Sequence, residues 1–209
     1  MSTISEEYYR RYEELRCLLE RAYVDIYALQ EIEHYNESVQ KDGHVLPRSS
    51  FDVLGHICEL LKADLGLTIW KIYFDENPKA NTIKSFLSYI CKNCANLVNG
   101  LHLPKTSLPK ELRDTEKQLS ILRKKHLAHN DAEKQHTTIK ISELISITEH
   151  LRTVLNGLCF SDIDKRATVI TDQRLLKIRC SVSLGLGMMI YRNTFPIEAE
   201  DESPHNSKE

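Results

Sequence analysis

The feature that most constrains the fold is a long apolar repeat near the N-terminus. Its members recur at alternating steps of four and three residues: Tyr8, Tyr12, Leu15, Leu19, Ala22, Ile26 and Leu29. This near-heptad spacing, called the seam below, predicts a helix from Thr3 or Ser5 to about Glu33. A helix of roughly 30 residues is about 45 Å long. Its apolar face therefore has to pack along a helical bundle or along a second chain, and we expect a dimer.

Glycine and proline are scarce, which favours long helices over a fold of many strands. The chain has 209 residues, of which 7 are Gly and 6 are Pro. We therefore expect an all-α fold with three parts. Residues 1–159 form a helical bundle, residues 160–196 form an extension that packs on it as a helix or as short strands, and residues 197–209 form a disordered acidic tail.

The second predicted helix is apolar around most of its circumference. A loop over Asn36–Arg48 precedes it, and Ser49 or Ser50 caps its start. It runs to about Phe74, where a polar turn containing proline ends it. A helix with so little polar surface is expected to be central and buried.

Three further helices complete the predicted bundle. Their expected limits are Asn81 or Thr82 to Gly100, near Pro109 toward Asn130, and Ser142–Leu158. In the extension, Phe160–Thr171 fits a loop or a short strand. Leu175–Tyr191 is interpreted as a helix, although Ser181–Gly187 also alternates as a strand would.

Charge and cysteine usage limit the class of protein. The net charge of −2 does not indicate a nucleic-acid partner for the whole surface, so any anion site has to be local.

The apolar stretch Ser181–Tyr191 is shorter than the ~20 residues of a spanning helix, so we expect no membrane association. No signal peptide is visible, so the six cysteines suggest a reducing, cytoplasmic location. Cys91 and Cys94 lack a second ligand pair, and we expect neither metal nor cofactor.

The fourth predicted helix carries the residues with the most chemical potential. Its inward stripe is Leu112, Thr115, Leu119, Leu122, His126 and His129, with histidines at the last two positions. Arg123 lies beside the stripe, and Arg123, His126 and His129 fall within about 120° of the helix circumference. One face thus offers a permanent cation and two groups that titrate near neutral pH. The alternative is that both histidines are structural, or solvated at a helix end where cations are favoured.

Arg123 to Asp131 resembles the Arg-x(4–6)-His signature of HEPN domains, here with five residues between Arg123 and His129. The segment Leu127-Ala128-His129-Asn130-Asp131 is most similar to the corresponding segment of the abortive-infection AbiU-like branch. The same branch typically has a turn of the type Asp-x-Asn-Pro followed by a helix that starts with Asn-Thr-Ile. This sequence has Asp75-Glu76-Asn77-Pro78 and then Asn81-Thr82-Ile83, in the same order. The resemblance covers roughly residues 8–158.

The resemblance implies an antiparallel bundle that commonly forms homodimers and brings two Arg–His motifs to one cleft. Active members are metal-independent endoribonucleases of phage defence or toxin–antitoxin pairs, so an RNA substrate and a nucleotidyltransferase-like antitoxin are the implied partners.

Carried over by residue, His129 is the catalytic histidine and Arg123 the phosphate-binding arginine, with Lys124, His126, Asn130 and Asp131 in supporting positions. The chain departs from the family pattern at Lys124, where many active members have Asn, Asp or His. The rival hypothesis is a non-catalytic helical module that binds a protein or an RNA.

Overall fold

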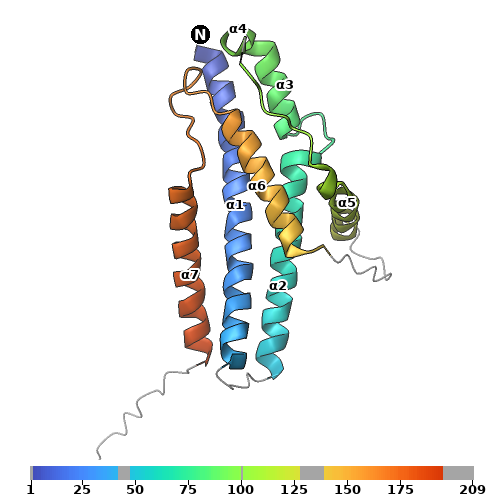
Figure 1. Cartoon of the computed structure of the whole chain (residues 1–209), viewed down its shortest axis with the longest axis vertical. Helices are drawn as coiled ribbons and strands as arrows, with labels where there is room; N and C mark the ends of the chain where they lie inside the picture. The colour runs from blue at the N-terminus through green and yellow to red at the C-terminus, as the bar shows by residue number, and fades with distance from the viewer. Residues whose placement is uncertain (1, 42–47, 100, 128–138, 195–209) are drawn as a thin grey trace, which may run out of the picture.

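The computed structural model describes residues 2–41, 48–99, 101–127 and 139–194 (Figure 1). Every regular element in these ranges is a helix, which confirms the predicted all-α class. The order is α1 (Ser2–Lys41), α2 (Arg48–Ile69), the π-helix η1 (Trp70–Phe74), α3 (Ile83–Asn93), α4 (Ala95–Val98), the 3₁₀-helix η2 (Lys110–Leu112), α5 (Arg113–Leu127), α6 (Ile141–Gly157) and α7 (Asp172–Thr194).

Helix α1 is the central element of the bundle (Figure 1). Helices α2 and α7 flank it on opposite sides, and α6 crosses its N-terminal half. The chain runs antiparallel to α1 in α2 and α6 and parallel to it in α7. Helix α5 packs on the outer side of α2, away from α7.

The seam of α1 is buried within a single chain. All seven of its residues are at most 2% exposed. Near the N-terminus, the Tyr8 hydroxyl donates to the Leu158 carbonyl oxygen and accepts from the Phe160 N–H, each at 2.7 Å, while the Tyr8 ring lies 5.4 Å from that of Phe86. Because other helices of the same chain cover the seam, it no longer argues for a second chain.

Helix α1 is longer than predicted. The loop expected over Asn36–Arg48 is wrong for residues 36–41, which continue α1, and for Arg48, which begins α2. No glycine or proline precedes Gly43 in this polar segment, so nothing interrupts the helix before that point.

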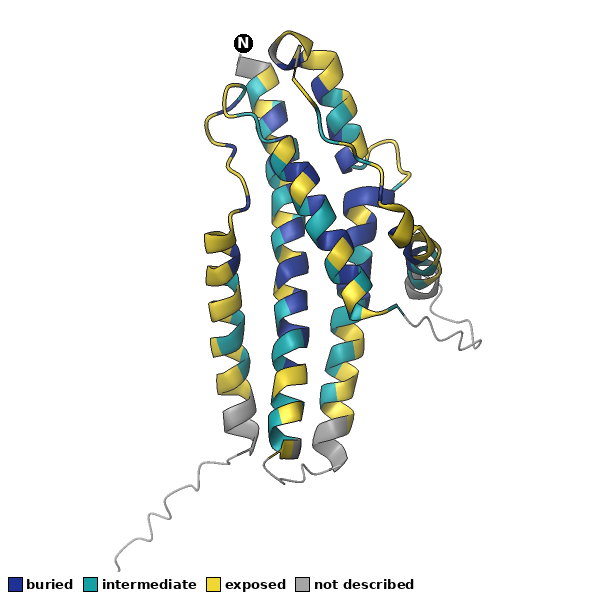
Figure 2. Cartoon of the chain, viewed as in Figure 1, coloured by how far each residue is buried: buried dark blue, intermediate teal, exposed yellow. Residues whose placement is uncertain are grey.

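The second helix was predicted to be central and buried, which is right for its C-terminal half and wrong for its N-terminal half. Leu65 and Ile69 are fully covered, and the chain continues as η1 with Trp70, Ile72, Tyr73 and Phe74 buried. The N-terminal half, by contrast, is coloured mostly as exposed or intermediate in Figure 2. Val53 and Leu60 in this half are 59% and 53% exposed. The apolar pattern indicated burial, but the covering helices reach only part of the length of α2.

The third helix begins as predicted and ends early. Thr82 caps α3 in a reciprocal capping box with Ser85. The predicted end at Gly100 was wrong, because α3 ends at Asn93 and Cys94 leaves the helical conformation before the short α4. The break lets Cys94 and Val98 both reach the hydrophobic core.

The extension after the bundle contains a helix. Residues 160–171 form turns and coil, and α7 includes Ser181–Gly187, so the helical interpretation is confirmed. Arg174 pairs with Glu20 at 2.9 Å and the Ser183 hydroxyl donates to Glu31 at 2.7 Å, which holds α7 against α1. In the described ranges, no helix has both the length and the apolar character to cross a membrane. The predicted tail, 197–209, lies outside the described residues.

Candidate phosphate-binding site

A glycine on α2 sets the position of α5. A Cβ atom at Gly66 would lie 2.4 Å from Leu122 Cδ2 and 3.2 Å from Leu119 Cδ2. A side chain at this position would therefore force the leucines of α5 to move. This close approach places Arg123, the neighbour of Leu122, at the junction of α5 with the end of α2 and η1.

Arg123 lies over the indole ring of Trp70. Its guanidinium carbon is 5.1 Å from the ring centroid, within the range of a cation–π interaction. Trp70 is itself fixed, because its ring stacks on that of Phe74 at 5.3 Å and Phe74 meets Tyr73 edge to face at 4.7 Å. The Tyr73 hydroxyl accepts the N–H of Leu108 at 3.1 Å. The guanidinium therefore rests on a rigid aromatic platform.

Arg123 also lacks a counter-ion within the described part of the chain. Eight other arginines there pair with carboxylates: Arg10, Arg11, Arg16, Arg21, Arg152, Arg166, Arg174 and Arg179. Arg113 also has no carboxylate partner among the described residues, but it is exposed at the start of α5, whereas Arg123 is half-buried.

A guanidinium stays charged at all physiological pH values, and its N–H groups can bind two phosphate oxygens side by side. Stacking on Trp70 restricts the guanidinium plane without using these donors. Arg123 is therefore suited to bind an anion such as a phosphate group.

The remaining predicted site residues are only partly located. Lys124 and His126 lie on α5, but the positions of their side chains fall outside what the structure describes. His129, Asn130 and Asp131 lie outside the described residues altogether. The structure thus places Arg123 on α5 beside Trp70, and its proximity to His129 stays a prediction.

The inward stripe of α5 is confirmed where it can be followed. Leu112, Thr115 and Leu119 are buried and Leu122 is half-buried against the core. The Thr115 hydroxyl lies 3.4 Å from a carboxylate oxygen of Glu143, which connects this face to α6.

Sequence reasoning missed Trp70 and Gly66 as parts of this site. Trp70 was one of many apolar residues in the second helix, and nothing in local spacing pairs it with a residue on α5. Gly66 was the one sequence signal from which this packing could have been predicted, because a glycine inside an apolar helix often marks a close approach of another backbone or side chain.

A buried carboxyl group, Asp25 of α1, lies beside the more exposed Asp64 of α2. Asp25 is 5% exposed, and its Oδ2 atom has no hydrogen-bond partner among the described residues. Burial and the neighbouring Asp64 raise the pKa of Asp25 to about 7, while Arg21 opposes the shift. Arg21 binds both carboxylate oxygens of Asp64, at 3.0 and 2.8 Å. Asp25 is consequently a group that binds a proton near neutral pH.

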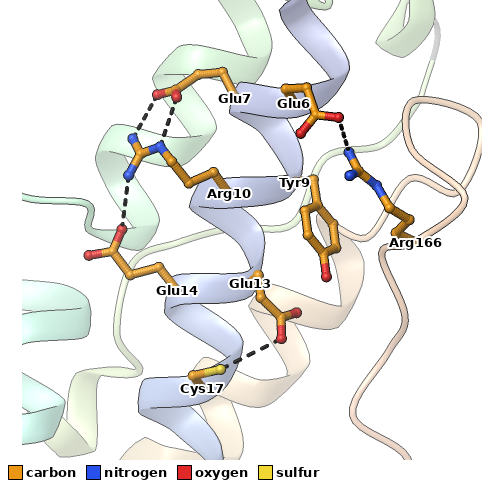
Figure 3. A pocket seen from close by; sticks show the side chains of 8 residues that line it. All are labelled: Glu6, Glu7, Tyr9, Arg10, Glu13, Glu14, Cys17 and Arg166. Carbon is orange, nitrogen blue, oxygen red and sulfur yellow. Dashed lines mark hydrogen bonds and ion pairs between the residues drawn. The ribbon is translucent and has the colours of Figure 1, made fainter. Parts of the chain in front are cut away.

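A shallow pocket of about 590 Å³ lies along the N-terminal part of α1 (Figure 3). Its residues are Glu6, Glu7, Tyr9, Arg10, Glu13, Glu14, Cys17 and Arg166. Its charges neutralise one another: Arg10 binds Glu7 and Glu14, and Arg166 binds Glu6 while lying over the Tyr9 ring. The pocket therefore offers no unpaired cation to a phosphate.

Metal ligands do not gather in the described part of the chain. No group of three or more His, Cys, Asp or Glu side chains there is arranged to hold a metal ion. Within the C-x-x-C pair, Cys91 is exposed and Cys94 is buried in the core.

Comparison with known proteins adds no relative: no family model, no curated protein and no solved structure matches the chain.

Proposed function

We propose that the protein is a metal-independent endoribonuclease of the HEPN type, acting in phage defence or as the toxin of a toxin–antitoxin pair. One observation supports the proposal most directly. Arg123 is half-buried over the ring of Trp70 and has no carboxylate partner among the described residues. The Arg123-x(5)-His129 spacing adds a proton-transfer group to the same segment. The proposed location is cytoplasmic, and the proposed antitoxin is nucleotidyltransferase-like.

The chemistry requires no metal. A base takes the proton of a ribose 2′-OH, and the oxygen attacks the adjacent phosphorus. The bond from phosphorus to the 5′-oxygen breaks, and an acid protonates that leaving oxygen. Arg123 binds the non-bridging oxygens, on which negative charge develops. His129 acts as the base, and the candidates for the acid are His126 and His129 of a second copy.

The test compares two unpaired arginines of the same helix. Arg123→Ala is expected to lower the rate of RNA cleavage by about 10²-fold or more, since it removes the cation at the phosphate. Arg123→Lys should also be impaired, because an ammonium group cannot make the bidentate contact. Arg113→Ala is the matched control and should cleave like the wild type. Equal cleavage by Arg123→Ala and Arg113→Ala would refute the assignment.

The rival function, a non-catalytic interaction module, is favoured by the exposed apolar residues Val53 and Leu60 on α2. It predicts binding to a protein or an RNA without cleavage, and no difference between wild type and His129→Ala in any assay of RNA integrity.

A further inference from the structure

Five cationic side chains lie over aromatic rings in the described part of the chain. Three of them also pair with carboxylates: Arg11, Arg166 and Arg179. The other two, Arg123 over Trp70 and Lys84 over Tyr73, have no carboxylate partner among the described residues. The charges of these two therefore remain available to an anion from outside the protein.

Both of these cations lie on one aromatic cluster, called the η1 rings and defined as Trp70, Tyr73 and Phe74. The Phe74 ring lies 5.3 Å from that of Trp70 and 4.7 Å from that of Tyr73. The Lys84 Nζ atom is 4.2 Å from the Tyr73 centroid, and the Arg123 guanidinium carbon is 5.1 Å from the Trp70 centroid. The two charges therefore lie within about 20 Å of each other, at most about six nucleotides at a rise of 3.4 Å.

The η1 rings hold the two cations from different helices. Lys84 is exposed in the first turn of α3, and Arg123 is in the last turns of α5. Helix η1 packs against both α3 and α5, which lie on the side of the bundle away from α7 (Figure 1). A contact with a ring face restricts a cation without using its N–H donors. Both side chains can consequently bind phosphate oxygens from defined positions.

One acidic residue also acts on this region. Burial raises the pKa of the Tyr73 hydroxyl, and the negative charge of Glu116 on α5 adds to the rise. Neither Lys84 nor Arg123 forms an ion pair with Glu116 in the described part of the chain. Glu116 therefore leaves both cations unpaired, and its charge opposes the approach of a phosphate.

We propose that Lys84 and Arg123 bind different phosphates of one RNA strand, which runs across the η1 rings from α3 to α5. Arg123 binds the phosphate at the cleaved bond, and Lys84 binds a phosphate several nucleotides away. The choice of RNA as the ligand rests on the proposed function. The inference adds the substrate class, which is a strand of several nucleotides rather than a mononucleotide or a dinucleotide.

The salt dependence of binding tests the proposal, because each phosphate contact releases counterions. The probes are 2′-O-methyl oligouridylates, which lack the attacking hydroxyl and stay intact. With a probe of about ten nucleotides, Lys84→Gln and Arg123→Gln should each lower the slope of log Kd against log salt by about 0.7, and the double variant by about 1.4. With the dinucleotide, which has one phosphate, Arg123→Gln should raise the Kd and Lys84→Gln should not, since the guanidinium binds two oxygens at once.

Three further variants separate charge from structure. Lys84→Arg keeps the charge and should keep the wild-type slope. Lys177→Gln changes an exposed lysine of α7 that has no carboxylate partner among the described residues, and it should also bind like the wild type. Glu116→Gln should bind the longer probe more tightly, because it removes the opposing charge.

The outcomes distinguish this inference from the proposed function. A wild type that does not bind the longer probe overturns the inference, as does a slope that Lys84→Gln leaves at the wild-type value. Cleavage of unmodified RNA combined with an unchanged slope for Lys84→Gln would refute the strand path alone. Binding that depends on both cations, without cleavage of unmodified RNA, would support the strand path and refute the proposed function.

Discussion

Arg123 lies over the ring of Trp70, with its guanidinium carbon 5.1 Å from the ring centroid, although the two residues belong to separate helices. The contact gives the arginine a defined position without occupying its hydrogen-bond donors. In an RNA-cleaving site, such a cation would meet the phosphate with little loss of side-chain freedom on binding.

Loss of the aromatic platform should weaken RNA binding. Trp70→Leu removes the cation–π contact, worth about 0.5–2 kcal/mol, and should raise the Kd for RNA by roughly 2- to 30-fold. Trp70→Phe keeps an aromatic face and should recover most of the affinity. Fluorescence anisotropy with the same RNA measures both variants, and an unchanged Kd for a folded Trp70→Leu would show that the platform has no role in binding.

A larger side chain at Gly66 should displace α5. Gly66→Leu is expected to cost about 1–3 kcal/mol of unfolding free energy, because Leu119 and Leu122 have to move. The control Gly55→Leu lies at an open, exposed position and should be neutral or slightly stabilising, since leucine favours helix more than glycine does. Urea denaturation compares the two, and equal stabilities would mean that α5 is not held where Gly66 places it.

The buried carboxyl of Asp25 should make stability depend on pH. Its pKa rises from the ordinary 3.8 to about 7 in the folded protein, so the fold favours the protonated form. This contribution is present in full below about pH 4 and is lost as the pH rises to about 7.

Asp25→Asn imitates the protonated form at every pH. Because the pKa rises from 3.8 to about 7 on folding, the variant should gain about 4 kcal/mol relative to the wild type between pH 4 and pH 8. Because both proteins share all other titrating groups, the difference between their unfolding free energies isolates Asp25. A difference that stays constant with pH would show that Asp25 titrates normally.

The Tyr8 hydroxyl should contribute measurably to stability. Tyr8→Phe leaves the buried ring in place but removes the partner of the Leu158 carbonyl and of the Phe160 N–H. We expect a loss of about 1–3 kcal/mol, since two buried backbone groups lose their hydrogen bond. Thermal denaturation should show it, whereas a Tm equal to that of the wild type would mean that water replaces the hydroxyl.

The sequence predicted what depends on local periodicity. The seam from Tyr8 to Leu29, the cap at Thr82 and the inward face of α5 followed from spacing and from residue type. The exposure of the N-terminal half of α2 could not be predicted, because an apolar pattern does not show how far the covering helices extend over Val53 and Leu60. The partner of Arg123 was also beyond reach, since Trp70 meets it only through the packing of two distant helices.

The central claim is that Arg123 and His129 cleave RNA without a metal, and the chemistry of the product ends tests it most directly. RNA incubated in EDTA with the wild type should yield fragments with 2′,3′-cyclic phosphate and 5′-hydroxyl ends. His129→Ala, while still folded, should lower the rate by about 10²–10⁴-fold. Intact RNA with the wild type, 5′-phosphate ends, or unchanged cleavage by His129→Ala would contradict the account.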